Sequence, residues 1–155
     1  MNELVRDCEN EFIVSPKIYY YSDKNRFWFA GGYFNRLKGT SYHYYYKEKD
    51  NGQSIVEYCD YAPTCCLLIK KEVFETIGLM DPIYFMYSDD TDFCMRAKLA
   101  GYKIKISRKS VMYHKVSLST GGEDSKLSVY YINRNRFYFL DRYRRQFSVF
   151  AMPFT

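Results

Sequence analysis

The run from Phe85 to Arg96 constrains this chain more than any other segment. It places three carboxylates, Asp89, Asp90 and Asp92, directly after an apolar, aromatic stretch and at the start of a predicted helix that ends at Gly101. Three acids within four positions repel one another, and the free N–H groups and positive dipole of a helix N-terminus offset part of that repulsion. Acids also occur in first turns without any chemical role, but a concentration of this kind indicates a reactive site.

Composition limits the class of protein. A length of 155 residues with 47% hydrophobic content suits one domain with a substantial core. The net charge of +5 favours an anionic partner, such as a nucleotide diphosphate or an acidic membrane surface, and is too small for a dedicated nucleic-acid binder. No apolar run reaches the roughly 18 residues that a spanning helix needs, and the first residues do not resemble a signal peptide, so we expect a cytoplasmic location.

Alternating helix-like and strand-like segments predict an α/β fold. Helices are expected over residues 2–10, 70–77, 89–100 and about 127–147, and strands over 12–21, 27–34, 38–46, 55–61, 64–69, 102–107 and 111–113. Pro16 indicates an edge strand or a bulge, and the Gly31-Gly32 pair indicates a bend or a close backbone approach. Ser88 is the expected N-cap of the acidic helix. The five cysteines match neither a disulfide framework nor a zinc pattern, so free thiols are expected.

Several further segments accompany the acidic run in a fixed order: Ser15-Pro16-Lys17-Ile18, Trp28-Phe29-Ala30-Gly31-Gly32, Glu72 to Phe85, Ala100-Gly101-Tyr102, Val111 to Ser117 and Tyr131 to Arg136. Together they resemble the C-terminal half of family-2 glycosyltransferases, inverting enzymes of the GT-A fold that include many rhamnosyltransferase-like proteins. The resemblance covers about residues 12 to 143. It implies the acceptor-binding half of that fold, a mixed sheet with flanking helices.

The resemblance also assigns a general base. In an inverting transfer, a carboxylate removes the acceptor hydroxyl proton while the oxygen attacks the anomeric carbon of a nucleotide-diphosphate sugar. The second residue of the family's acidic pair maps to Asp90. Asp89 stands where the family more often has Glu, and Asp92 is expected to orient Arg96 or to cap the helix.

Other site residues follow from the same resemblance, each with a structural alternative. His114 is a candidate metal ligand or diphosphate contact, or else a hydrogen-bonded structural histidine. Arg134 and Arg136 could bind the diphosphate through their planar guanidinium groups, or lie on a solvated face. Trp28 and His43 are candidates for lining the acceptor site, or else pack in the core.

Nothing in the chain resembles the family's N-terminal strand, base-binding loop or metal-binding acid pair. We therefore expect residues 1–155 to be a partial domain that lacks the nucleotide-binding half and is inactive alone. A divalent metal, Mg²⁺ or Mn²⁺, would take most of its ligands from that missing half. An unpaired sheet edge and apolar surface predict self-association.

The predicted function is transfer of a sugar to a hydroxyl of a surface polysaccharide or glycolipid. The basic, aromatic helix over about 127–147 suits attachment at the inner face of the cytoplasmic membrane. The alternative is a non-catalytic carbohydrate-binding or assembly module derived from the same fold. Nucleic-acid binding through the arginine-rich helix is a distant third hypothesis, and no nucleic-acid partner is expected.

Overall fold

The computed structural model describes residues 2–116 and 125–147. Ser117, the last residue of one motif segment, lies outside these ranges. The helices are α1 (Asn2–Glu9), α2 (Lys71–Ile77), α3 (Asp89–Leu99) and α4 (Lys126–Arg142), with short 3-10 turns η1 (Thr64–Cys66), η2 (Pro82–Tyr84) and η3 (Arg144–Gln146). The strands are β1 (Ile13–Tyr20), β2 (Phe27–Phe29), β3 (Gly32–Asn35), β4 (Thr40–His43), β5 (Tyr58–Cys59), β6 (Leu68–Ile69) and β7 (Ile104–His114).

β1 is the centre of the main sheet. It pairs with β7 in parallel along its whole length, and β5 adds an antiparallel strand to the far side of β7. On its other side, β1 pairs antiparallel with β6 near its start and with β2 near its end. The prediction of an α/β fold with a mixed sheet and flanking helices is therefore confirmed.

Pro16 lies opposite a bulge in β7, and its own strand is central and not an edge. Pro16 lies opposite Ser107 on β7, whereas the next residue, Lys17, lies opposite Val111, so β7 carries three extra residues at this point. Pro16 also falls between the stretches of β1 that pair with β6 and with β2. Because proline has no N–H to donate, the ladder is interrupted where the sequence places it. The two strands predicted over 102–107 and 111–113 are thus one strand with an irregular middle.

The segment over residues 64–69 differs from its prediction as a buried strand. It forms the turn η1 and then the two-residue strand β6, and the Cys65 side chain is exposed. Only Ile13 and Val14 of β1 pair with this segment. A longer strand therefore has no ladder to join, because β2 pairs with the other end of β1 along the same side.

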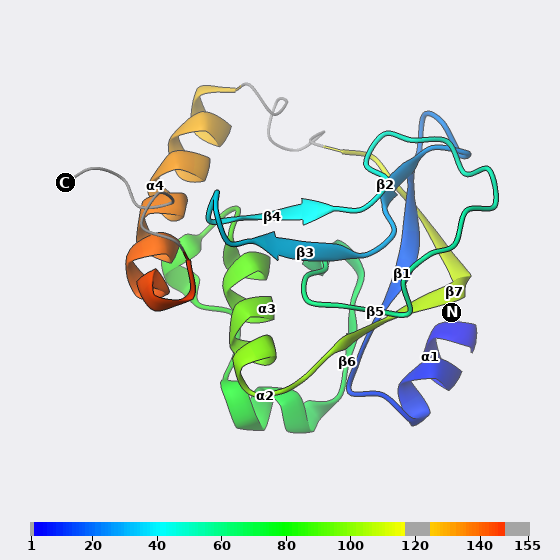
Figure 1. The fold of residues 1–155 in the computed structure, drawn as a ribbon, viewed down its shortest axis with the longest axis horizontal. Helices are drawn as coiled ribbons and strands as arrows, with labels where there is room; N and C mark the ends of the chain where they lie inside the picture. Colours follow the sequence, from blue (N-terminus) through cyan, green and yellow to red (C-terminus); the bar gives the residue numbers. More distant parts are fainter. Residues whose placement is uncertain (1, 117–124, 148–155) are drawn as a thin grey trace.

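Helices cover both faces of the sheet (Figure 1). Ile13 belongs to the main core with Phe93 of α3 and Phe139 of α4, whereas its neighbour Val14 packs in a small second cluster with Leu4 of α1. Neighbouring residues of a strand point to opposite faces, so α1 lies on one face and α3 on the other. The β3–β4 hairpin lies between the sheet and α4 (Figure 1), and Phe34 stacks on Phe139.

The helices end where the sequence indicates. Gly78 follows α2 with a φ of 79°, and Gly101 closes the end of α3 with a φ of 88°, a backbone conformation in which glycine is the favoured residue. The helix predicted over about 127–147 is found as α4 followed by η3. Among the described helices, none combines the length and the apolar character needed to cross a membrane.

Candidate active site

Asp90 lies in the first turn of α3 with both carboxylate oxygens held in place. Its Oδ1 accepts hydrogen bonds from the backbone N–H of Thr91 at 2.7 Å and from the Thr91 hydroxyl at 3.1 Å. Its Oδ2 accepts a hydrogen bond from the Tyr61 hydroxyl at 3.0 Å. The Asp90 residue is half-buried, so the fold fixes its orientation while part of its surface still faces solvent.

The surroundings of Asp90 make it a stronger base than an ordinary aspartate. Burial raises its pKa to about 6, and the neighbouring charge of Asp89 acts in the same direction. The hydrogen bonds from Tyr61 and Thr91 oppose this rise because they stabilise the charged form. A carboxyl group with this pKa is largely ionised at neutral pH and still accepts a proton readily, as general-base catalysis requires.

An aromatic wall extends from Asp90 toward the end of β7. The Tyr61 ring stacks on His43 with 5.7 Å between ring centroids. His43 Nδ1 lies 2.7 Å from the carbonyl oxygen of Trp28, whose indole ring meets the rings of His43 at 5.0 Å and His114 at 4.6 Å. The tertiary structure therefore gathers Trp28, His43 and His114, which the sequence separates by up to 86 positions, into one aromatic group that Tyr61 connects to the candidate base.

Both histidines favour the neutral form. Burial lowers the pKa of His43 and of His114. Within residues 2–116 and 125–147, no three His, Cys, Asp or Glu side chains gather in a way that could hold a metal ion. His114 therefore belongs to no such group of three among the described residues, and its role at a divalent metal stays a prediction.

Asp92 is fully buried and joins α3 to α4. Its Oδ2 accepts a hydrogen bond from Arg96 Nε at 2.8 Å, the contact that the sequence led us to expect. Its Oδ1 accepts from the hydroxyls of Tyr143 at 2.7 Å and Tyr84 at 3.3 Å, and lies 3.2 Å from Arg142 Nη1. With two guanidinium groups and two hydroxyls around it, this carboxylate serves packing and not proton transfer.

Arg96 continues this network toward the loop before η2. Its Nη1 donates to the carbonyl oxygens of Ile77 and Gly78, and its Nη2 donates to that of Leu79 at 2.9 Å. These carbonyl groups follow α2, where helix C-termini leave acceptors without intrahelical partners. Arg96 therefore fixes how the chain enters the acidic segment.

The structure does not bring Arg134 and Arg136 together. Arg134 Nη1 donates to the carbonyl oxygen of Ile83 at 2.8 Å, whereas Arg136 Nη2 donates to that of Lys38 at 3.0 Å in the β3–β4 turn. Each guanidinium group thus braces a different segment of backbone. Diphosphate binding by these two residues stays a prediction.

Asn135 shapes the approach to the site, although the sequence assigned it no role. It is fully buried, and its Nδ2 lies 2.7–2.9 Å from the carbonyl oxygens of Tyr84, Met86 and Tyr87. These carbonyls belong to the loop that leads into Asp89 and Asp90. Three non-glycine residues of this loop have positive φ: Phe85, Tyr87 and Ser88. Backbone held in this region costs about 1–3 kcal/mol per residue and persists only where the surroundings impose it.

Ser88 does not cap α3 through its side chain, contrary to the prediction. Its φ of 63° and ψ of −4° place it in the left-handed region, and its side chain makes no capping hydrogen bond. A capping serine normally takes an extended backbone conformation that turns its hydroxyl toward the helix. Asn135 holds the preceding carbonyls, so the loop enters the helix from a different direction.

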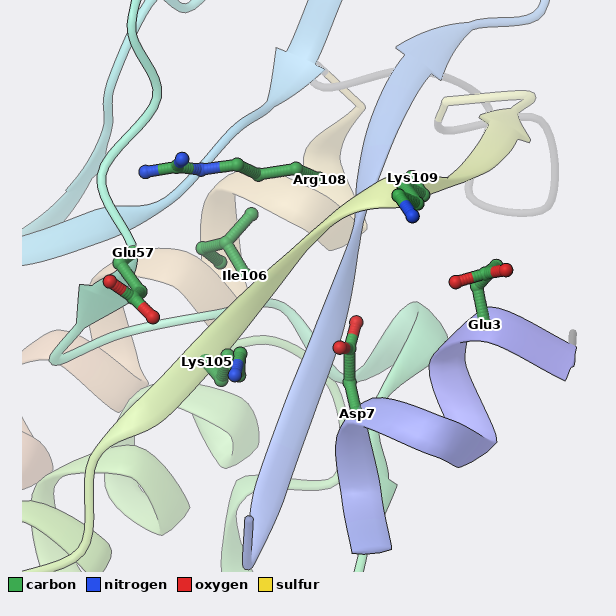
Figure 2. Close-up of a pocket in the computed structure, with 7 residues that line it drawn as sticks. All are labelled: Glu3, Asp7, Glu57, Lys105, Ile106, Arg108 and Lys109. Atoms are coloured by element: carbon green, nitrogen blue, oxygen red, sulfur yellow. The ribbon is translucent and has the colours of Figure 1, made fainter. Parts of the chain in front are cut away.

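A separate hollow of about 210 Å³ lies between α1 and β7 (Figure 2). Glu3 and Asp7 reach it from α1, and Lys105 and Lys109 reach it from β7. Glu57 and Arg108 also line it, so its acidic and basic side chains balance. Because these charges cancel, the hollow has little preference for a charged ligand.

Comparisons with known proteins point to one activity. Over 78 residues, half of this chain, the sequence is 32% identical to the low-salt glycan biosynthesis hexosyltransferase Agl10 of Haloferax volcanii, and the aligned segment covers 25% of that protein. Over 61 residues, 39% of the chain, it is 34% identical to the uncharacterized protein y4gI of Sinorhizobium fredii, of which 7% is covered. No family model matches the chain. The chain thus resembles part of a glycan-building transferase, and both relatives are much longer than their aligned segments.

Proposed function

We propose that this chain is the acceptor-binding, base-bearing part of an inverting glycosyltransferase of the GT-A type. Asp90 carries the proposal, because it is the carboxylate whose orientation is fixed, whose pKa is raised to about 6 and which borders an aromatic wall. The similarity to a hexosyltransferase supports the class of reaction. The proposed substrates are a nucleotide-diphosphate sugar and a hydroxyl group of a polysaccharide or glycolipid.

In the proposed reaction, Asp90 accepts the proton of the acceptor hydroxyl as that oxygen bonds to the anomeric carbon. The bond from the anomeric carbon to the nucleoside diphosphate breaks, and the leaving group departs with the electron pair. Trp28 and His43 offer the acceptor apolar ring surface, on which the faces of sugar rings pack. The raised pKa of Asp90 makes it a better proton acceptor than an ordinary aspartate.

The donor side of the site is also part of the proposal. A divalent cation, Mg²⁺ or Mn²⁺, would neutralise the leaving diphosphate, with His114 as one candidate donor and the others from residues beyond this chain. Arg134 and Arg136 remain candidates for the diphosphate. Action at the inner face of the cytoplasmic membrane would give the enzyme access to lipid-linked acceptors.

The decisive test replaces Asp90 with Asn in the active protein. Release of nucleoside diphosphate in the presence of acceptor should fall by about 10²–10⁴-fold, the usual contribution of a general base, because an amide cannot take the proton. Acceptor binding and folding should persist. Asp141→Asn is the matched control, since Asp141 is an exposed acid on α4 with a single ion pair, to Arg144.

Two outcomes would change the assignment. Near-normal turnover of Asp90→Asn would show that Asp90 is not the base. Acceptor binding with no turnover in the protein as it occurs in the cell, and no dependence on divalent metal, would favour the carbohydrate-binding module.

A further inference from the structure

The two carboxylate oxygens of Asp90 differ in how many further hydrogen bonds they can accept. A carboxylate oxygen commonly accepts two hydrogen bonds. Among the residues that the structure describes, Oδ1 already accepts two, both from Thr91, whereas Oδ2 accepts one, donated by Tyr61. Oδ2 therefore keeps a lone pair for a substrate hydroxyl, and the direction of that lone pair depends on where the Tyr61 hydroxyl sits.

Tyr61 is itself fixed on every side. Its ring is buried between His43 and Phe34, at centroid distances of 5.7 and 6.1 Å. Its backbone N–H donates to the carbonyl oxygen of Gly32 on β3. A Cβ at Gly32 would lie 2.7 Å from Tyr61 Cδ1 and 2.9 Å from its carbonyl oxygen, so only glycine permits this approach.

The Tyr61 hydroxyl also has a defined direction. It donates its proton to Asp90 Oδ2, 3.0 Å away. Burial and the charge of Asp90 raise the pKa of Tyr61 well above its ordinary value, so the hydroxyl keeps its proton. Tyr61 and Asp90 thus form a direct donor–acceptor pair that joins the segment before η1 to the first turn of α3.

We propose that Tyr61 is the positioning residue of Asp90 and that Oδ2 is the oxygen that receives the acceptor proton. The inference rests on the proposed role of Asp90 as base. Tyr61 does not touch the reacting atoms. It holds Oδ2 at the angle at which the remaining lone pair faces the acceptor, and it stabilises the ionised carboxylate before the proton arrives.

The other groups that face Asp90 do not duplicate this function. Asp89 is on the same helix and raises the pKa of Asp90 by repulsion. Cys65 of η1 and Cys94 of α3 interact with Asp90, but desolvation of the sulfur atoms raises the pKa of both thiols and keeps them neutral. Tyr61 is therefore the donor, from outside α3, that favours the charged form of Asp90.

The test compares Tyr61→Phe with the unaltered protein by two measurements. A ¹³C-carboxyl NMR titration of this chain follows the ionisation of Asp90 directly. Loss of the donated hydrogen bond should raise the pKa of Asp90 by roughly one pH unit. In the active protein, kcat should fall about 10-fold to 100-fold with KM within about twofold, and the loss should be larger at pH 6.5 than at pH 8.5.

A matched control makes the test specific to Tyr61. Tyr33→Phe on the β3–β4 hairpin is this control, because its hydroxyl has no role at Asp90, and both measurements should stay unchanged.

The outcomes separate this inference from the proposed function. If the Asp90 titration is unaltered in Tyr61→Phe, Tyr61 only packs and the inference is wrong, whatever Asp90→Asn does to transfer. If Asp90→Asn leaves transfer intact while the titration shifts as expected, the coupling exists but the proposed base is wrong.

Discussion

Asp90 and Asp92 lie two positions apart and take opposite roles. Asp92 is fully buried between the guanidinium groups of Arg96 and Arg142, and removal of one partner from such a buried pair costs about 3–5 kcal/mol. Asp90 meets only neutral donors and the negative charge of Asp89. Desolvation disfavours the charged form of a carboxylate that has no neighbouring cation, so its pKa rises. The raised pKa also makes the carboxylate a stronger base.

Ionised Asp90 should therefore destabilise the fold. Its folded pKa of about 6 lies above the ordinary value of 3.8, so its favourable contribution is present in full below pH 3.8 and is lost as pH rises through 6. Asp90→Asn should raise the free energy of unfolding by about 1–3 kcal/mol at pH 7.5, with little effect near pH 4.

Urea unfolding of both proteins at the two pH values measures this difference. Asp141→Asn controls for the loss of one surface charge and should change stability by less than about 0.5 kcal/mol. Equal stability of Asp90→Asn and the unaltered protein at pH 7.5 would contradict a raised pKa.

At the scale of elements, the approach to the site depends on α4. The loop before α3 has three non-glycine residues in the left-handed region, and the Asn135 amide holds three of its carbonyl oxygens. Arg134 adds a hydrogen bond to Ile83. α4, whose basic and aromatic composition led us to expect membrane attachment, therefore also shapes the segment that presents Asp90.

Asn135→Ala should destabilise the protein by about 2–4 kcal/mol, because it removes the side-chain donor to the part-buried carbonyl oxygens of Met86 and Tyr87. Asn133→Ala is the control on the same helix: its exposed amide contacts only Val129 one turn earlier, at 2.8 Å, and its loss should cost less than about 0.5 kcal/mol. Differential scanning calorimetry compares the two. Similar Tm values for both variants would show that Asn135 does not hold the loop.

At the scale of the whole molecule, α4 presents an apolar and basic outer surface. Tyr130 and Phe137 are 60% and 55% exposed and lie seven residues apart, hence on one side of the helix. Lys126 and Arg136 are exposed on the same helix. Aromatic rings with flanking cations suit the interface of an anionic membrane. α1 lies at the opposite end of the molecule from α4 (Figure 1) and therefore offers a control surface.

The membrane proposal predicts binding to vesicles that contain anionic lipid. Exchange of Tyr130 and Phe137 for Ser should weaken this binding at least about tenfold, because burial of each ring is worth roughly 1.5–3 kcal/mol. Vesicle sedimentation at low and high salt measures the effect. Val5→Ser changes an exposed apolar residue on α1 and should bind as the unaltered protein does. Equal binding of the unaltered protein, the Tyr130 and Phe137 variant and Val5→Ser would show that α4 does not contact the membrane.

Local patterns gave much of the fold correctly. Apolar periodicity and glycine positions located α1, α2, α3 and α4, and the acidic first turn of α3 is where the sequence placed it. The bulge at Pro16 follows from a missing N–H, a property of one residue. The segment over 64–69 was misjudged because whether an apolar stretch forms a strand depends on which ladder remains open beside it.

The sequence by itself determined the α/β alternation, the ends of the helices and the three carboxylates at the start of α3, because each depends on residues within one or two turns of one another. Only the tertiary structure decided what those carboxylates do. The Tyr61 hydroxyl meets Asp90 from 29 positions away, and the Asn135 amide meets Tyr87 from 48. Burial and partners set a pKa, and both arise only when distant segments pack together.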